Sequence, residues 1–325
     1  QVLTNADTPE QAETARKLGA QGIGLCRTEH MFFDPNRISA MRAMIVAEDK
    51  AERIQHLDTL SEFQRSDITD MLKAMDGLPL TVRLLDPPLH EFLPHSKEEM
   101  QALATTLGKS VQVVEDRVAQ LQEVNPMLGF RGCRLSVVYP EITEMQARAV
   151  AAAAAECKKA GLDPKPEIMV PVVSTARELK LIVPRIEAAV KEVLAEAGVE
   201  LEIPIGTMME LPRACQTADD IVNTDNVKFM SFGTNDLTQS VWGFSRDDAI
   251  KFIGRYSEQV GICGEHGGEP SSVAFFHSLD FNYVSCSPFR VPIARIAAGQ
   301  AAAAELASKE EKKDKLYRES ITNVK

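Results

Sequence analysis

The stretch EIMVPVVSTARELKLIVPRIEAAVKEVLAEAGVELEIPIGTMMEL, residues 167–211, sets the fold of this chain. Short apolar runs at 167–173 and 203–211 are typical of buried strands, and the segment 175–198 between them has apolar residues at helical spacing. A strand, a helix and a second strand in succession are typical of a parallel sheet covered by helices. The stretch therefore predicts a β–α–β unit.

The same alternation extends in both directions from this unit, with helical segments at 141–160 and 292–307. Eight strand–helix units in a chain of this length predict a (β/α)8 TIM barrel. Its first two crossovers, 31–78 and 87–126, are longer than one helix requires, so we expect extra helices there. The six further strands are predicted at 22–30, 79–86, 127–135, 228–236, 261–267 and 283–289.

The composition is that of an ordinary soluble globular protein, with enough residues for one large barrel or two medium domains. The 325 residues are 44% hydrophobic and 26% charged, which is enough to build a sizeable core. We expect the barrel to occupy residues 1–307, followed over 308–325 by a charged, solvated tail, for which disorder is one possibility. The net charge is −11 and no long basic run precedes this tail, which argues against nucleic acid as a partner.

Cysteine usage and hydropathy bear on the cellular compartment. The six cysteines are scattered without CxxC spacing, which favours a reducing environment over a disulfide scaffold. The sequence contains neither a signal-peptide core nor an apolar span of transmembrane length. We therefore expect a soluble protein of a reducing compartment that is neither secreted nor inserted in a membrane, with both the cytoplasm and the plastid stroma left open.

Polar residues follow the ends of the predicted strands, where barrels of this class place reacting groups. Arg27, Arg83 and Arg131 would converge there, and guanidinium forks suit phosphate or carboxylate oxygens. Glu210 and Asp236 end neighbouring strands, and two carboxylates with ligand oxygens and water satisfy octahedral Mg²⁺. The set predicts an anion site beside a metal, although any one member could instead be a surface ion pair or a cap. Glu29 and Asp86 also fall at strand ends.

The segment SFGTNDLTQ, residues 231–239, adds a candidate anion-binding loop. Gly233 and Thr234 precede Asn235 and Asp236, so main-chain N–H groups could approach an anion closely while Asn235 offers an amide donor. A simple turn explains the glycine equally well.

Cys263 lies in GICGEHGGEP, residues 261–270. The glycines around it would let a substrate approach the thiol, and arginines with a metal nearby would bring its pKa into a useful range for an acid, a base or a nucleophile. The alternative is a packing residue, as we expect the other five cysteines to be. No lysine ends a predicted strand, which argues against a Schiff-base aldolase. Nor does the sequence carry a phosphate-binding GxxxxGK[ST] loop or a dinucleotide-binding fingerprint.

Eight motifs together resemble the pyruvate phosphate dikinase family. They are GLCRTEHMFF, TVRLLDPPLHEFLP, NPMLGFRGCRL, EIMVPVV, GTMMELPRA, SFGTNDLTQ, GICGEHGGEP and YVSCSPFRVPIAR. The resemblance covers nearly the whole chain and is to the C-terminal barrel that binds phosphoenolpyruvate or pyruvate. The motifs LDPPLHEFLP and GICGEHGG favour this family over phosphoenolpyruvate synthase and over enzyme I of the sugar phosphotransferase system.

The resemblance implies an enzyme that uses Mg²⁺ and forms a homodimer. Its overall reaction converts ATP, pyruvate and phosphate into AMP, phosphoenolpyruvate and diphosphate, and this domain interconverts pyruvate plus phosphohistidine with phosphoenolpyruvate. The phosphohistidine belongs to a mobile central domain, the expected partner of this one. Neither that domain nor the N-terminal ATP-grasp domain of the family has a counterpart in this sequence, so we expect the chain alone not to run the full reaction.

The resemblance also implies roles for single residues. Cys263 would be the proton donor, and in the opposite direction it would remove a methyl proton from pyruvate while arginines and Mg²⁺ stabilise the enolate oxygen that attacks phosphorus. The implied substrate-binding residues are Arg27, Arg83, Arg131, Glu210, Gly233, Thr234, Asn235 and Asp236, with Glu210 and Asp236 as the Mg²⁺ ligands.

One departure from the family pattern keeps other readings open. Only IGRYSEQV, residues 253–260, separates GFSRDDAIKF from GICGEHGG, whereas the family has a longer stretch there. If that stretch is truly lost, the chain could be a non-catalytic dimerisation domain. A metal-dependent lyase that forms a pyruvate enolate without phosphoryl transfer is the other alternative.

Overall fold

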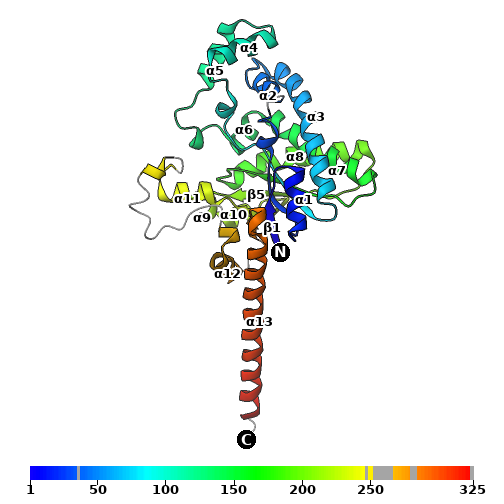
Figure 1. The fold of residues 1–325 in the computed structure, drawn as a ribbon, viewed down its shortest axis with the longest axis vertical. Helices are drawn as coiled ribbons and strands as arrows, with labels where there is room; N and C mark the ends of the chain where they lie inside the picture. Colours follow the sequence, from blue (N-terminus) through cyan, green and yellow to red (C-terminus); the bar gives the residue numbers. More distant parts are fainter. Residues whose placement is uncertain (35–36, 246–247, 252–265, 279–283, 323–325) are drawn as a thin grey trace.

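The computed structural model describes residues 1–34, 37–245, 248–251, 266–278 and 284–322 (Figure 1). Over these ranges, seven strands form one parallel sheet in the order β6-β5-β4-β3-β2-β1-β7. The last strand in the chain pairs with the first, with Val2 opposite Val284. The two edges of this curled sheet are therefore β6 and β7. The strands are β1 (Val2–Asn5), β2 (Ile23–Arg27), β3 (Pro79–Arg83), β4 (Lys165–Val170), β5 (Ile205–Met209), β6 (Val227–Phe232) and β7 (Val284–Cys286).

The parallel α/β class and six of the eight predicted strands are confirmed. A strand buried in a parallel sheet appears as a short apolar run, and β5, for example, is buried at every position. β1 was not predicted, because its sequence VLTN has only two apolar residues before the polar Thr4 and Asn5. Its strand conformation depends on pairing with β2 on one side and with β7 on the other.

The strand predicted at 127–135 is wrong. The chain forms a short 3-10 helix, η3 (Pro126–Leu128), and then α6 (Cys133–Val138). Gly132 has φ +56, which turns the chain out of an extended path, and its N–H donates to the main-chain oxygen of Asp86 at 3.1 Å. Of the strand predicted at 261–267, residues 261–265 lie outside the described part of the chain, so the complete eight-stranded barrel stays a prediction.

Helices cover the sheet and fill both long crossovers, as predicted. The first crossover contains α2 (Ile38–Ile45) and α3 (Lys50–Ala74), and the second contains α4 (Lys97–Leu107) and α5 (Val111–Leu121). Figure 1 shows α4 and α5 together at the end of the molecule opposite the C-terminus. The other helices of the first two thirds of the chain are α1 (Pro9–Lys17), α7 (Pro140–Lys159) and α8 (Ala176–Ala197).

Local sequence signals fix where several helices begin and end. Thr175 and Glu178 form a capping box at the start of α8, and Gly198 ends that helix with φ +65. Ser96 and Glu99 form the same box at the start of α4. These caps satisfy main-chain N–H groups that would otherwise lack partners.

Two apolar cores support the two parts of the fold. The larger core joins the sheet to α3, α7 and α8, and the small side chains of α7, such as Ala151 and Ala154, are fully buried within it. The second core lies among α2, α4 and α5 and is built around Phe32 and Phe92. The long crossovers therefore form a lobe with a core of its own.

The charged segment that follows residue 307 is helical as far as Thr322. α13 (Val291–Thr322) continues as one helix through the charged segment, and Figure 1 shows it extending away from the sheet. Its first turns are anchored by the buried Val291 and Ala294, and Lys and Glu favour the continuation of a helix that has already begun. Nowhere in the described residues does a helix have both the length and the apolar character needed to cross a membrane. The remaining helices are α9 (Pro212–Gln216), α10 (Ala218–Val222), α11 (Thr234–Trp242) and α12 (Pro270–Ser278).

Candidate functional site

The candidate site lies at the C-terminal edge of the sheet. Arg27 and Arg83 are the last residues of β2 and β3 and stand opposite each other in the ladder. Glu210 directly follows β5, and Asp236 lies in the first turn of α11, just after β6. Because all strands are parallel, their C-terminal ends share one edge of the sheet, as predicted.

Arg83 is buried between two carboxylates. Its guanidinium donates to Glu29 Oε1 at 2.5 Å and pairs with Asp86 Oδ2 at 2.9 Å, and only 8% of the residue is exposed. Burial opposes the charged form, but Asp86, Glu29 and Glu210 more than offset it, so the pKa of Arg83 is raised. Arg83 is therefore a permanent positive charge inside the protein.

Arg131 extends this pair into a connected network. Nη2 donates to Asp86 Oδ1 at 2.7 Å, and Nη1 donates to Asp236 Oδ1 at 2.9 Å. Burial again opposes the charge, and Asp86 and Asp236 outweigh it, so the pKa of Arg131 is raised as well. The turn that breaks the predicted strand at 127–135 is what brings Arg131 here, because Gly132 and Cys133 bond to main-chain oxygens of Asp86 and Pro171.

Glu210 lies beside this network and is almost completely buried, with 1% exposed. Its Oε1 accepts a hydrogen bond from the main-chain N–H of Val172 at 2.6 Å. Burial, and then the charges of Asp86 and Asp236, raise the pKa of Glu210 to about 8, although Arg83 opposes the shift. Ionisation of Glu210 is therefore unfavourable in this buried site unless a cation lies nearby.

Gly233 brings the main chain against Glu210. A Cβ atom placed on Gly233 would lie 2.3 Å from Glu210 Oε2 and 2.7 Å from Met208 Sδ, so only glycine fits. This close approach explains why the predicted loop has glycine at position 233, in addition to the turn that the sequence suggested. Of the other loop residues, Thr234 is half-buried at the start of α11, and Asn235 is exposed to solvent.

Arg27 belongs to a second, more accessible cluster. Its Nε and Nη2 donate to Asp7 Oδ2 at 3.0 and 2.6 Å, and His30 Nδ1 is 2.8 Å from the same oxygen. The Asp7 side chain is buried, with 4% exposed, whereas 37% of the Arg27 side chain is exposed. Asp7 thus fixes the direction of Arg27 and leaves part of the guanidinium open to solvent.

This arrangement predicts that Asp7→Asn weakens anion binding through Arg27. An asparagine keeps the size of the side chain but loses the charge that orients the guanidinium, so we expect a small phosphate-bearing anion to bind about 10-fold more weakly. Calorimetric titration would measure the affinity. His30→Gln would control for loss of the imidazole contact, and equal affinities for Asp7→Asn and the unmodified chain would contradict the role of Asp7.

The charges fit a divalent cation. Within the described residues, the network contains two arginines against Glu29, Asp86, Glu210 and Asp236, so its net charge is −2 when all are ionised. Glu29 Oε2 is also buried without a hydrogen-bond partner. No three His, Cys, Asp or Glu side chains in the described ranges are grouped to hold a metal. Glu210 and Asp236 alone would thus need substrate oxygens and water to complete the coordination.

Sequence and structure agree on part of the site. Arg83, Arg131, Glu210, Gly233 and Asp236 are brought together, whereas Arg27 lies in its own cluster and Cys263 lies outside the described residues. No role was predicted from the sequence for Asp7, Glu29 or Asp86. The positions of Glu29 and Asp86 at strand ends were a usable signal, but Asp7 follows the strand that was missed.

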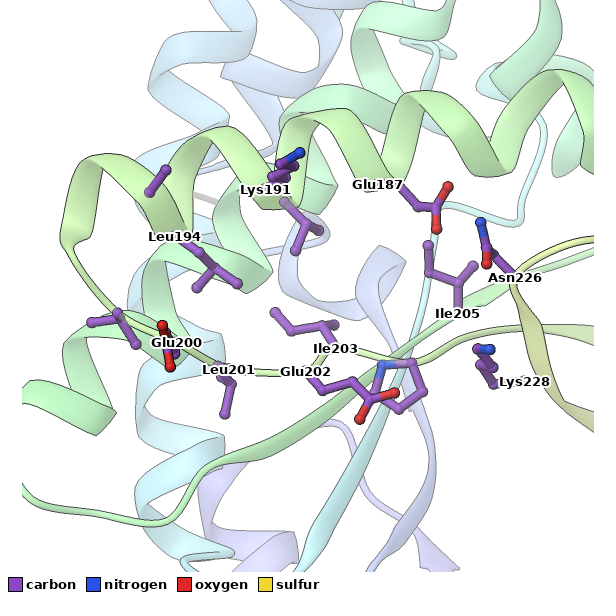
Figure 2. Close-up of a pocket in the computed structure, with 14 residues that line it drawn as sticks. Glu187, Lys191, Leu194, Glu200, Leu201, Glu202, Ile203, Ile205, Asn226 and Lys228 are labelled. Carbon is purple, nitrogen blue, oxygen red and sulfur yellow. The ribbon is translucent and has the colours of Figure 1, made fainter.

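A separate pocket of about 550 Å³ lies where β5 and β6 begin, the end of the sheet opposite the network (Figure 2). The C-terminal half of α8 and the segment leading into β5 form its walls. Leu194, Leu201 and Ile203 line it together with Lys191 and Lys228. None of the predicted site residues lines this pocket.

Fold and network together define the class of the protein. A domain with a curled parallel sheet and an arginine–carboxylate network at its C-terminal edge is suited to a small anion held with a metal. The family described as PEP-utilising enzyme, PEP-binding domain, matches residues 1–258 and 247–303, and the chain belongs to this family.

Curated relatives narrow the comparison further. Pyruvate, phosphate dikinase of Clostridium symbiosum is 49% identical over 93% of this chain, which covers 38% of that protein. The chloroplastic pyruvate, phosphate dikinase 1 of Arabidopsis thaliana is 51% identical over 92% of this chain, and the enzyme of Giardia intestinalis is 46% identical over 93%. The chain spans 35% of the Arabidopsis protein and 38% of the Giardia protein.

The comparisons also bear on the short segment 253–260. The alignment with the Clostridium enzyme extends over 337 positions, more than the 325 residues of this chain. The family matches in two pieces that overlap at 247–258. The alignment length shows only that gaps are present, whereas the overlap of the two pieces agrees with the predicted departure from the family pattern at this segment.

Proposed function

We propose that this chain is the phosphoenolpyruvate- and pyruvate-binding part of a pyruvate, phosphate dikinase. Its half-reaction would interconvert pyruvate plus phosphohistidine with phosphoenolpyruvate. The observation that carries the proposal is the buried network in which Asp86 joins Arg83 to Arg131 beside Glu210. Relatives with this activity in their names, at about half identity over nearly the whole chain, support it.

Each part of the network has a chemical role in this proposal. Arg83 and Arg131 would stabilise negative charge that develops on substrate oxygens, because they are fixed and charged before the substrate arrives. Glu210 and Asp236 would hold Mg²⁺, which when bound would balance the excess carboxylates and polarise the keto oxygen of pyruvate. Arg27 would contact the phosphoryl group from the more open side, while Gly233, Thr234 and Asn235 would border the substrate.

The proton transfer is assigned to Cys263 from the sequence. In the direction of phosphoenolpyruvate formation, its thiolate would take a proton from the methyl group of pyruvate. The enolate oxygen would attack phosphorus, and the bond from phosphorus to the histidine nitrogen would break.

The five cysteines that the structure describes are poorly suited to this proton transfer, which supports its assignment to Cys263. All five are free, and four of them are buried. Burial raises the pKa of each, that of Cys286 to about 11, so none is poised to exchange a proton near neutral pH.

Further features belong to the same proposal. The barrel would be completed by the run at 261–267 and would occupy residues 1–307, ahead of the charged segment 308–325. The phosphohistidine would come from a separate domain of the full-length enzyme, and two chains would form a homodimer. Because relatives include bacterial and chloroplastic enzymes, we place this one in the cytoplasm or the plastid stroma.

Calorimetric titration of phosphoenolpyruvate into the 325-residue chain, with and without Mg²⁺, tests the proposal. We expect binding that requires the metal. We expect Cys263→Ala to retain this binding but to lose exchange of the pyruvate methyl protons with solvent deuterium, measured by NMR. If the folded, unmodified chain binds no phosphoenolpyruvate with Mg²⁺, the catalytic proposal is wrong and the non-catalytic alternative is favoured.

A further inference from the structure

The backbone of Val172 has an unusual conformation beside the site. Its φ is +58, in the left-handed region, and among the described residues only Asn226 is another non-glycine with positive φ. Asparagine tolerates that region, whereas a β-branched valine is a marked outlier there. Such conformations persist where the surrounding contacts leave the chain no alternative, and they cluster at functional sites.

Contacts on both sides of Val172 hold it in place. The carbonyl of Val172 accepts a hydrogen bond from Cys133 Sγ at 3.1 Å, and the carbonyl of Pro171 accepts one from the Cys133 N–H at 3.1 Å. Gly132 packs so closely that a Cβ there would lie 2.6 Å from Val172 Cγ2. The turn that carries Arg131 into the site therefore also fixes the backbone at Val172.

The consequence of this conformation is the direction of one N–H group. The Val172 N–H donates to Glu210 Oε1 at 2.6 Å, and both residues are buried. The second oxygen of the same carboxylate, Oε2, faces the main chain of Gly233. Burial raises the pKa of Glu210, and the Val172 N–H acts in the opposite direction by stabilising the ionised form.

We propose that Val172 is a positioning residue, whose left-handed backbone aims its N–H at Oε1 of Glu210 and so leaves Oε2 to bind the metal. This inference rests on the proposed function, because it assumes that Glu210 is a metal ligand. Hydrogen bonds from outside the ligand set orient metal ligands, and their loss costs metal affinity 10- to 100-fold. The group that acts is the main-chain N–H, so side-chain substitution alone would not remove it.

Replacement of the amide by an ester at position 172 tests this role. Incorporation of 2-hydroxyisovaleric acid removes the N–H and keeps the valine side chain. With phosphoenolpyruvate present, we expect Mn²⁺, followed by electron paramagnetic resonance, to bind the ester variant about 10- to 100-fold more weakly than the unmodified chain. The same ester at the neighbouring Val173 controls for the chemistry of the replacement and should bind Mn²⁺ like the unmodified chain.

A metal-free measurement tests the hydrogen bond separately. In chain labelled with ¹⁵N-valine, a short bond to a carboxylate should shift the Val172 amide proton downfield, and Glu210→Ala should remove that shift. If the amide proton is not shifted, or if the ester variant binds Mn²⁺ as tightly as the unmodified chain, the inference is overturned while the proposed function stands. If the unmodified chain binds no Mn²⁺ even though the amide proton is shifted, the proposed function fails and the positioning role fails with it.

Discussion

Arg83→Met should cost this protein both stability and substrate binding. The substitution keeps an apolar stem of similar length but leaves Glu29 buried without its counter-charge and leaves Asp86 with Arg131 as its remaining cationic partner. Removing one partner of a buried ion pair costs about 3–5 kcal/mol of unfolding free energy. Because Arg83 is also a proposed substrate donor, we expect the affinity for phosphoenolpyruvate with Mg²⁺ to fall by roughly 100-fold or more. Urea unfolding and calorimetric titration would measure the two effects.

A matched surface pair separates burial from charge. Arg185 pairs with Glu144 at 3.3 Å, but the two side chains are 52% and 38% exposed. Arg185→Met should therefore change the unfolding free energy by less than about 1 kcal/mol and leave substrate affinity unaltered. Equal effects at the two positions would contradict the importance of the buried network.

Arg83→Lys distinguishes the structural effect from the binding effect. Lysine restores one positive charge but not the planar fork that contacts Glu29 and Asp86 at the same time. We expect part of the stability to return, while phosphoenolpyruvate affinity stays well below that of the unmodified chain. Full recovery of binding with lysine would show that Arg83 acts only through its charge.

Gly233→Ala is expected to abolish most metal-dependent binding without unfolding the protein. The φ of Gly233 is −92°, which alanine adopts without strain, so the effect is steric. The added methyl group would meet Glu210 Oε2 at 2.3 Å and force the carboxylate away from its position. A displacement of about 1 Å at a reacting group can cost about 100-fold, and we expect a loss of that order in Mn²⁺ and phosphoenolpyruvate affinity.

Gly299→Ala provides the control for this substitution. Gly299 lies within α13, and a Cβ there meets no atom of the described chain within 4 Å. Alanine should therefore be neutral for ligand binding and stabilise the helix by about 0.5–1 kcal/mol. Unchanged Mn²⁺ affinity in Gly233→Ala would mean that Glu210 adapts easily, and it would remove the steric argument for the loop.

The sequence by itself determined the parallel α/β class and most of the polar residues at its C-terminal edge. Strand and helix patterns extend over only a few residues, so they survive in the sequence without any tertiary information. For the same reason Arg27, Arg83, Glu210 and Asp236 could be placed at strand ends. The resemblance to a family then supplied their proposed roles, which no local pattern contains.

Only the tertiary structure decided how these residues meet. Arg131 bonds to Asp86, 45 residues earlier, and to Asp236, 105 residues later, and no pattern within a strand encodes such pairs. The same holds for the turn at Gly132, which depends on distant main-chain oxygens, and for β1, which is a strand only between its two neighbours. Periodicity reports which face of a segment is buried, whereas ion pairs and left-handed turns depend on what the folded chain places opposite that face.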